Sequence, residues 1–171
     1  RAEKAALKAR LEESKNDGKA TTTTGPTEYY PVLVVVDDCS RYVYAIAALE
    51  AATAMEIRSV LERVLPQTVK YLISDNGPQF LSEELKAFCE GEPGIMHVRI
   101  YPHHPCENGR AERQIRTVKD LLELYGWENL EGLRIATTKV REEMNETPHQ
   151  GIGYRIPVEY HQGGMACQAE T

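Results

Sequence analysis

The sequence predicts an α/β fold in which helices flank a mixed β-sheet. Two observations lead to this prediction. Short apolar segments rich in β-branched residues recur along the chain, and the later ones are separated by amphipathic helical patterns. The expected strands lie at 31–37, 42–49, 69–74 and 97–101. Because helices cross between strands, the sheet is expected to be covered by helices, with ligands collecting at strand ends.

The N-terminal residues have the composition of a helix. Residues 1–15 are strong helix formers, and Asn16, Asp17 and Gly18 form a turn signal. We therefore expect a helix or linker over 1–19, a core domain over 20–163, and a frayed tail over 164–171.

A hairpin and a helix are expected next. Residues 31–37 are almost continuously apolar, which is typical of a strand buried on both faces, and a turn over 38–41 leads to the second strand at 42–49. Thr53 then begins a helix that runs to about Leu65, where Pro66 ends it.

The second half of the chain continues the alternation. The strand at 69–74 ends in a turn over 75–78, Ser82 begins a helix to about Cys89, and 97–101 reads as an edge strand. A last helix is expected over 129–145, followed by irregular structure.

Residues 101–120 read as a loop that leads into a helix. Pro102 and Pro105 disfavour helix in the first half, and Asn108 with Gly109 forms a turn or cap signal, so the helix is expected from about residue 110. Glu112, Arg116 and Lys119 then share one helix face. This face is either a solvated surface with ordinary ion pairs or a site for a metal and phosphates.

Composition restricts the function classes. The chain is 42% hydrophobic with a net charge of −6, which disfavours a basic protein that coats DNA non-specifically. Between 98 and 119, however, the positive charges exceed the negative ones by three. No apolar run is long enough for a membrane span, and the charged N-terminus does not fit a signal peptide. Four dispersed cysteines without C-x-x-C spacing favour reduced thiols in an intracellular protein.

Two carboxylates are candidates for a metal site. Asp75 follows an apolar strand, and Glu112 lies 37 positions later, which leaves room for one helix and one strand that return the chain to the same strand end. Alone, Asp75 is typical of turn chemistry. Together with Glu112 and the nearby cations, it predicts a site for hard divalent ions and two-metal phosphoryl transfer.

Three segments carry a resemblance to a known family. They are VLVVVDDCSRYVYA, YLISDNGPQF and PHHPCENGRAERQIRTVKD, and NETPHQGIGYRIPVEYHQG resembles the usual C-terminal boundary. Over about 21–163 the chain resembles the catalytic core of retroviral integrases and DDE transposases, which implies a ribonuclease-H-like fold with a mixed five-stranded sheet.

The resemblance implies roles for individual residues. Asp75 and Glu112 match the second and third catalytic carboxylates, which would hold Mg²⁺ or Mn²⁺, two ions in a complete site. Asn108 matches a polar position in a flexible loop beside the site. Arg116 and Lys119 match positions that contact DNA, and Arg113 lies in the same motif with a less defined role. The implied partners are DNA and further copies of the chain, without a membrane, in a bacterial cytoplasm or a eukaryotic nucleus.

The first catalytic carboxylate of this family is not evident. Alignment places Thr22 or Thr23 where Asp is expected, and a Thr hydroxyl is a poor replacement for a carboxylate ligand of a hard cation. Asp17 and Asp37 are the alternatives, although Asp37 also fits a structural D-D-x-S-R pattern with Ser40 and Arg41. The sequence leaves open whether the first ligand is present or lost.

Three functions remain open at this point. The first is metal-dependent DNA end cleavage and strand transfer. The second is a catalytically inactive domain that docks DNA or oligomerises, and the third, a nuclease acting on RNA in a hybrid, fits the N-G-x-A-E-R helix less well. A zinc site at His103, His104 and Cys106 lacks a fourth ligand at suitable spacing.

Overall fold

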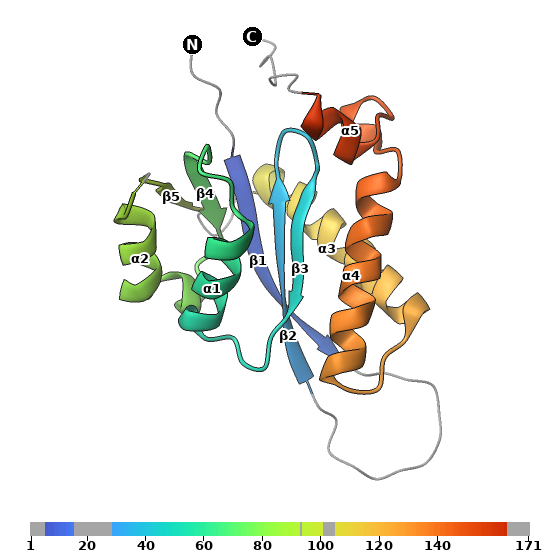
Figure 1. The fold of residues 1–171 in the computed structure, drawn as a ribbon, viewed down its shortest axis with the longest axis horizontal. Helices are drawn as coiled ribbons and strands as arrows, with labels where there is room; N and C mark the ends of the chain where they lie inside the picture. Colours follow the sequence, from blue (N-terminus) through green and yellow to red (C-terminus); the bar gives the residue numbers. More distant parts are fainter. Residues whose placement is uncertain (1–5, 16–28, 93, 101–104, 164–171) are drawn as a thin grey trace.

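The central feature of the computed structural model is a five-stranded mixed sheet with strand order β3-β2-β1-β4-β5 (Figure 1). The structure describes residues 6–15, 29–92, 94–100 and 105–163, and it describes side chains outside 6–15 and 105–111. The strands are β1 (Ala6–Lys15), β2 (Tyr29–Asp37), β3 (Val43–Ala48), β4 (Tyr71–Ser74) and β5 (Met96–Arg99). β1 pairs antiparallel with β2 and parallel with β4, and β4 pairs parallel with β5.

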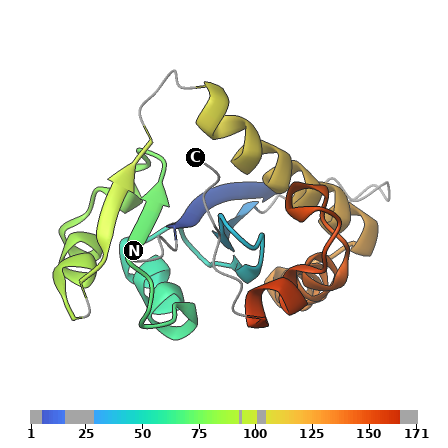
Figure 2. The same cartoon turned by 90° about the horizontal axis from the view of Figure 1, so that it is seen from above.

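Helices cover both faces of the sheet, as the sequence predicts. They are α1 (Ala54–Val64), α2 (Glu83–Glu90), α3 (Pro105–Tyr125), α4 (Leu130–Glu146) and α5 (Pro157–Gln162), with short 3₁₀ helices η1 (Pro78–Phe80) and η2 (Gln150–Ile152). In Figures 1 and 2, α1 and α2 lie on one side of the sheet, and α3 and α4 lie on the other. None of the helices in the described ranges is long and apolar enough to cross a membrane.

Strand β2 explains why there are two separate cores. Its side chains alternate, so Leu33 and Val35 join the cluster under α1 and α2, while Val32, Val34 and Val36 join the cluster under α3 and α4. All five are buried. The prediction that this strand is buried on both faces is therefore confirmed.

The prediction of a helix near the N-terminus is wrong. Residues 6–15 form β1, which lies between β2 and β4 at the middle of the sheet. Intrinsic helix propensity is a weak preference of a few tenths of a kcal/mol per residue, and pairing with backbone on both sides overrides it. The structure thus joins residues 6–15 to the core, whereas the sequence assigned them to a linker.

The predicted helix starts are confirmed where a polar side chain begins the helix. The Thr53 hydroxyl accepts from Glu56 N–H at 3.2 Å, that of Ser82 accepts from Leu85 N–H at 3.2 Å, and Asn129 Oδ1 accepts from Gly132 N–H at 2.9 Å. β5 is an edge strand, as predicted.

Helix α3 begins earlier than predicted, at Pro105 rather than near residue 110. Proline is well tolerated in the first helical turn, because its missing N–H would have no partner there. Asn108 consequently lies within α3, and its assignment to a loop is wrong. The sequence also did not predict α5, a short helix that begins at another proline, Pro157.

Two polar side chains hold the C-terminal helices to the sheet. Asn145 in α4 is buried, accepts from Val43 N–H at 2.8 Å and donates to Val43 C=O at 3.0 Å. In α5, His161 lies 3.1 Å from Ser40 Oγ and 3.0 Å from Tyr44 Oη. All four contacts end on β3 or on the turn before it, so this edge of the sheet is covered by helix.

Candidate functional site

Asp75 occupies the position directly after β4, in a turn that several bonds hold in place. Its Oδ1 accepts from Gly77 N–H at 3.0 Å, and Ser74 Oγ donates to its backbone carbonyl at 2.9 Å. The chain then enters η1, where Phe80 is buried and anchors the turn in the core. The turn chemistry expected of Asp75 is therefore real, and it fixes the direction in which the carboxylate leaves the strand.

The end of β4 is also fixed to the end of β5. Ile100 N–H donates to Ser74 C=O at 2.9 Å, and Asn76 Nδ2 donates to Ile100 C=O at 2.8 Å. His97 Nε2 lies 2.8 Å from Ser74 Oγ. Because the Ser74 hydroxyl gives its proton to Asp75, the His97 ring donates to Ser74, which assigns the proton to Nε2. Burial, and then the charge of Arg99, lower the pKa of His97 and favour this neutral ring.

Helix α3 carries the other predicted residues. Its buried side chains are Ile115, Val118 and Leu122, and the last two pack against the sheet in the cluster shared with α4. The predicted site residues of this helix whose side chains the structure describes are all exposed: Glu112, Arg113, Arg116 and Lys119. The shared outer face of Glu112, Arg116 and Lys119 thus lies beside the buried stripe, as their spacing predicts.

The two carboxylates lie on elements whose ends are directed toward the same side of the molecule. Figure 2 shows the carboxyl ends of β4 and β5 directed toward the side on which α3 begins. Asp75 follows β4, and Glu112 lies in the second turn of α3. Within the described residues no group of three or more His, Cys, Asp or Glu side chains is arranged to hold a metal. The described part of the chain therefore offers this pair without a third carboxylate.

The structure describes only one of the residues considered as the first carboxylate or at its aligned position. Asp17, Thr22 and Thr23 lie outside the described residues, as do His103 and His104. Asp37 is described, and it lies two strands away from Asp75, because it pairs with Leu7, which pairs with Leu72. Asp37 is therefore level with Leu72, two strand spacings across the sheet and three residues short of Asp75 along the strand direction. This corresponds to about 14 Å between the Cα atoms of Asp37 and Asp75. That distance is too large for both to bind one ion.

Asp37 instead has a structural role. It is buried, and its Oδ2 accepts from Ser40 N–H at 2.7 Å and from Ser40 Oγ at 2.6 Å. Arg41 pairs with Asp38, with 2.9 Å between Nη1 and Oδ1. The D-D-x-S-R segment thus builds the turn between β2 and β3, which is the structural role that the sequence indicated for it.

The strand register identifies the residue that lies level with Asp75. Ala9 of β1 pairs with Ser74 of β4, so the next residue of β1, Arg10, is level with the residue after Ser74. The pairing itself ends at Ala9 and Ser74, and its continuation by one residue puts a cationic residue type level with Asp75. Sequence reasoning did not find this, because residues 6–15 were assigned to a helix.

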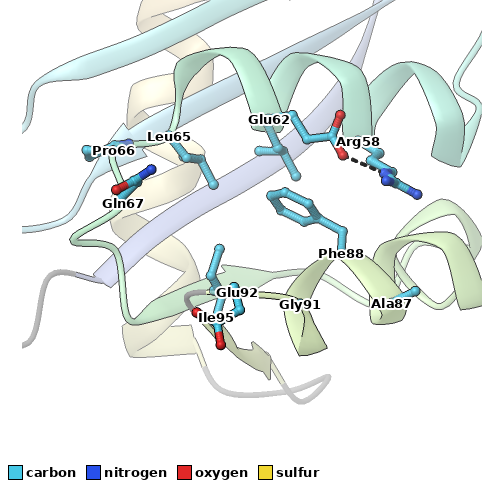
Figure 3. Close-up of a pocket in the computed structure, with 11 residues that line it drawn as sticks. Arg58, Glu62, Leu65, Pro66, Gln67, Ala87, Phe88, Gly91, Glu92 and Ile95 are labelled. Atoms are coloured by element: carbon cyan, nitrogen blue, oxygen red, sulfur yellow. Dashed lines mark hydrogen bonds and ion pairs between the residues drawn. The ribbon is translucent and has the colours of Figure 1, made fainter.

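A separate pocket lies between α1 and α2 (Figure 3). It has a volume of about 370 Å³, and Leu65, Phe88 and Ile95 contribute apolar side chains to it. The ion pair of Arg58 Nε with Glu62 Oε1, 2.7 Å apart, lies at the same pocket. None of the predicted site residues lines it, so this pocket is not the candidate site.

Comparison with known proteins identifies the family. Two models described as integrase core domain match the chain, one over residues 14–105 and the other over 93–157. The chain belongs to the integrase core domain family. The first match contains Asp75 and the second contains Glu112, so the family assignment covers both segments of the candidate site.

Curated relatives of this integrase core domain are much longer proteins. The Retrovirus-related Pol polyprotein from transposon TNT 1-94 of Nicotiana tabacum is 32% identical over 98 residues, which cover 55% of this chain and 7% of that protein. An uncharacterized protein of Caenorhabditis elegans is 29% identical over 143 residues, covering 81% of the chain and 11% of that protein. The chain therefore spans about a tenth or less of these relatives.

Solved structures show the same fold. The catalytic core domain of BIV integrase superposes with a TM-score of 0.66 at 24% identity, covering 91% of this chain and 94% of that one. The HTLV-2 integrase core in complex with magnesium superposes with a TM-score of 0.66 at 21% identity. The match covers 90% of this chain and 95% of that one. The predicted α/β, ribonuclease-H-like class is confirmed by these likenesses.

Proposed function

We propose that this integrase core domain carries out metal-dependent cleavage of DNA ends and joins the resulting 3′-hydroxyls to a target strand. One observation supports this most directly. Asp75 at the carboxyl end of β4 and Glu112 on α3 each lie in a matched integrase segment, and exposed cations accompany Glu112 on its helix. Carboxylates beside cations suit a reaction that transfers a phosphoryl group.

Asp75 and Glu112 are the residues that would hold Mg²⁺ or Mn²⁺. Both offer oxygen ligands, and Mg²⁺ is often bound through one or two carboxylates, with water and substrate phosphates completing its coordination. The pair therefore fits one ion, and a second ion requires the further carboxylate. A bound divalent ion supplies activation of the attacking oxygen and stabilisation of the leaving oxygen. The HTLV-2 integrase core, a structural neighbour, was solved with magnesium.

The cations of α3 would hold the DNA. Arg113, Arg116 and Lys119 are exposed along this helix, and Asn108 lies in its first turn. Contacts of Arg and Lys with phosphates fix the position of the duplex but carry little sequence information. We therefore expect this domain to position DNA ends and target, with sequence recognition residing elsewhere in the full-length protein.

A homo-oligomer is the proposed assembly. The HTLV-2 integrase core was solved in a dimeric and in a trimeric form, and a chain of the simian T-cell lymphotropic virus intasome gives a TM-score of 0.73 at 19% identity. The match with the intasome chain covers 99% of this chain and 57% of that one. Light scattering at increasing protein concentration measures the assembly, and a monomer at all concentrations would contradict the proposal.

A second candidate function is supported by the register of β1. The β1–β4 register, continued by one residue, puts Arg10 rather than an acidic residue level with Asp75, so this position of β1 supplies no carboxylate ligand. In this alternative the domain has lost catalysis and serves to dock DNA or to oligomerise. The same observation predicts which substitution would restore a ligand.

A strand-transfer assay separates the two functions. Pre-cut, fluorescent DNA ends are incubated with increasing Mn²⁺ and with the unaltered chain, or with Arg10→Asp, Thr22→Asp or Thr23→Asp. Activity of the unaltered chain that is abolished by Asp75→Asn and by Glu112→Gln supports catalysis. Activity that appears only in one Asp variant supports the inactive domain and locates the lost ligand.

The matched control is Glu123→Gln, which removes an exposed carboxylate from the same helix as Glu112. It should leave strand transfer unchanged. Activity that survives Glu112→Gln as well as Glu123→Gln would refute the assignment of Glu112 as a ligand.

A further inference from the structure

Two basic side chains from distant parts of the chain meet near η2, and the charge of a third, on α3, acts on one of them. Arg41 lies in the turn between β2 and β3, Arg113 lies on α3, and His149 directly precedes η2. The His149 ring is oriented by Gly151 N–H, which donates to its Nδ1 at 2.9 Å. Since Nδ1 accepts, the neutral ring carries its proton on Nε2 and can donate it.

Gly151 shows how closely these groups approach. A Cβ at Gly151 would lie 3.0 Å from His149 Cε1 and 3.4 Å from Arg41 Nε, so both side chains border the same small space. Partial burial, and then the charges of Arg41 and Arg113, lower the pKa of His149. The contact geometry thus joins Arg41 and His149, and Arg113 on α3 contributes its charge to the same ring.

The turn that presents Arg41 is strained. Arg41 has φ of +64°, a left-handed conformation that costs a non-glycine residue about 1 kcal/mol. Its guanidinium is held by Asp38, and the side chain is only 14% exposed. Asp38 offsets part of its charge, whereas Arg113 is exposed on α3. Strain of this kind often marks a functional position, because the surrounding structure must maintain it.

We propose that Arg41, Arg113 and His149 form a phosphate-binding site that holds one phosphodiester of the DNA lying along α3. Guanidinium groups bind phosphate oxygens through paired N–H donors, and a neutral imidazole adds a third donor. Arg113 directly follows Glu112, so the site begins one residue from that proposed metal ligand. The choice of DNA as ligand depends on the proposed function.

The arrangement of cations favours a polyanion over a single free phosphate. Arg113, Arg116 and Lys119 recur at intervals of three along α3, and all three are exposed. Because residues three apart are neighbours on a helix surface, these cations form a short row that begins at the cluster. A free phosphate ion would use one end of this row, whereas a DNA backbone can follow it.

DNA binding without divalent metal tests the site. Fluorescence anisotropy of a labelled duplex is measured in EDTA at several KCl concentrations. Arg113→Gln should weaken binding and lower the slope of log affinity against log salt by about 0.9, the value for one neutralised phosphate. His149→Ala should weaken binding about three- to tenfold, as expected for one lost hydrogen bond, with an unchanged slope because the ring is neutral.

Two further variants make the experiment specific. Gly151→Ala keeps every cation but introduces a Cβ 3.0 Å from the His149 ring, so it should displace the ring and weaken binding as His149→Ala does. Arg58→Gln is the matched control, because Arg58 is exposed and lies on α1, which packs on the opposite face of the sheet. If the site variants bind DNA no more weakly than Arg58→Gln, the proposal is refuted.

Inorganic phosphate distinguishes the two possible sources of the anion. NMR of the His149 ring should respond to duplex at micromolar concentration and much less to inorganic phosphate. An equal response to inorganic phosphate, with DNA affinity unaffected by the variants, would refute DNA as the ligand. Thermal unfolding of each variant checks its fold, and His149→Gln replaces His149→Ala if the latter does not fold.

The outcome is separable from that of the strand-transfer assay. If the chain shows no strand transfer but the site variants weaken its metal-free DNA binding, the proposed activity is refuted and the phosphate site is supported. If the chain shows strand transfer but these variants leave its DNA binding unaffected, the proposed activity is supported and the phosphate site is refuted.

Discussion

Replacing Asn145 should test whether the two bonds between α4 and β3 stabilise the fold. Its buried amide satisfies both the N–H and the C=O of Val43. In Asn145→Ala, both hydrogen bonds are lost and two backbone groups remain buried near the sheet edge. At about 1 kcal/mol for each bond, with an added desolvation cost for the unpaired groups, the free energy of unfolding should fall by about 2 to 4 kcal/mol.

Urea unfolding measures this loss, and thermal unfolding should show a midpoint lower by roughly 5 to 15 °C for a chain of this size. Asn129→Ala provides an internal scale, because it removes only the N-cap of the same helix and should cost about 1 kcal/mol. Asn145→Asp should destabilise at neutral pH, because a carboxylate can accept from Val43 N–H but cannot donate to Val43 C=O. A loss in Asn145→Ala no larger than that in Asn129→Ala would refute the reasoning.

Three further predictions concern single side chains. Ser82→Ala should lower the free energy of unfolding in urea by about 1 kcal/mol, since Leu85 N–H loses its N-cap acceptor, and an unchanged midpoint would contradict this. The lowered pKa of His97 means that the unfolded chain binds more protons than the folded one below about pH 6.5, so stability falls as the pH falls through this range. His97→Gln should flatten that decline in urea titrations at pH 5 to 7. Burial, and then Glu90, raise the pKa of Cys89 to about 11, so iodoacetamide should modify it far more slowly in the native protein than in urea, as peptide mass spectrometry would show.

Most of the fold was predictable because its signals are local. The alternating burial of β2 follows from an apolar, β-branched run, and the starts of α1, α2 and α4 follow from side chains that cap them. β1 was not predictable in this way. Its residues favour helix when considered alone, and its strand conformation depends on partners at 29–37 and 71–74.

In the candidate site, too, the features with a local sequence signal were predictable and those that depend on distant segments were not. Asp75 after a strand, and Glu112 with its helical neighbours, carry a recognisable spacing. Contacts between distant segments carry no such signal. The approach of Arg41 to His149 joins residues 108 positions apart, and the position of Arg10 level with Asp75 depends on the register of β1. Asp37 was open as a metal ligand until strand pairing placed it two strands away.

The position of β1 has a consequence for how the protein folds. Without it, the sheet would consist of two separate pairs, β2 with β3 and β4 with β5. β1 is made first, yet its parallel partner β4 follows more than 50 residues later, so this pairing closes a long loop before it gains stability. We therefore expect the two outer pairs to form early and the insertion of β1 to limit the folding rate. Substitutions in β1 should accordingly slow refolding more than they speed unfolding.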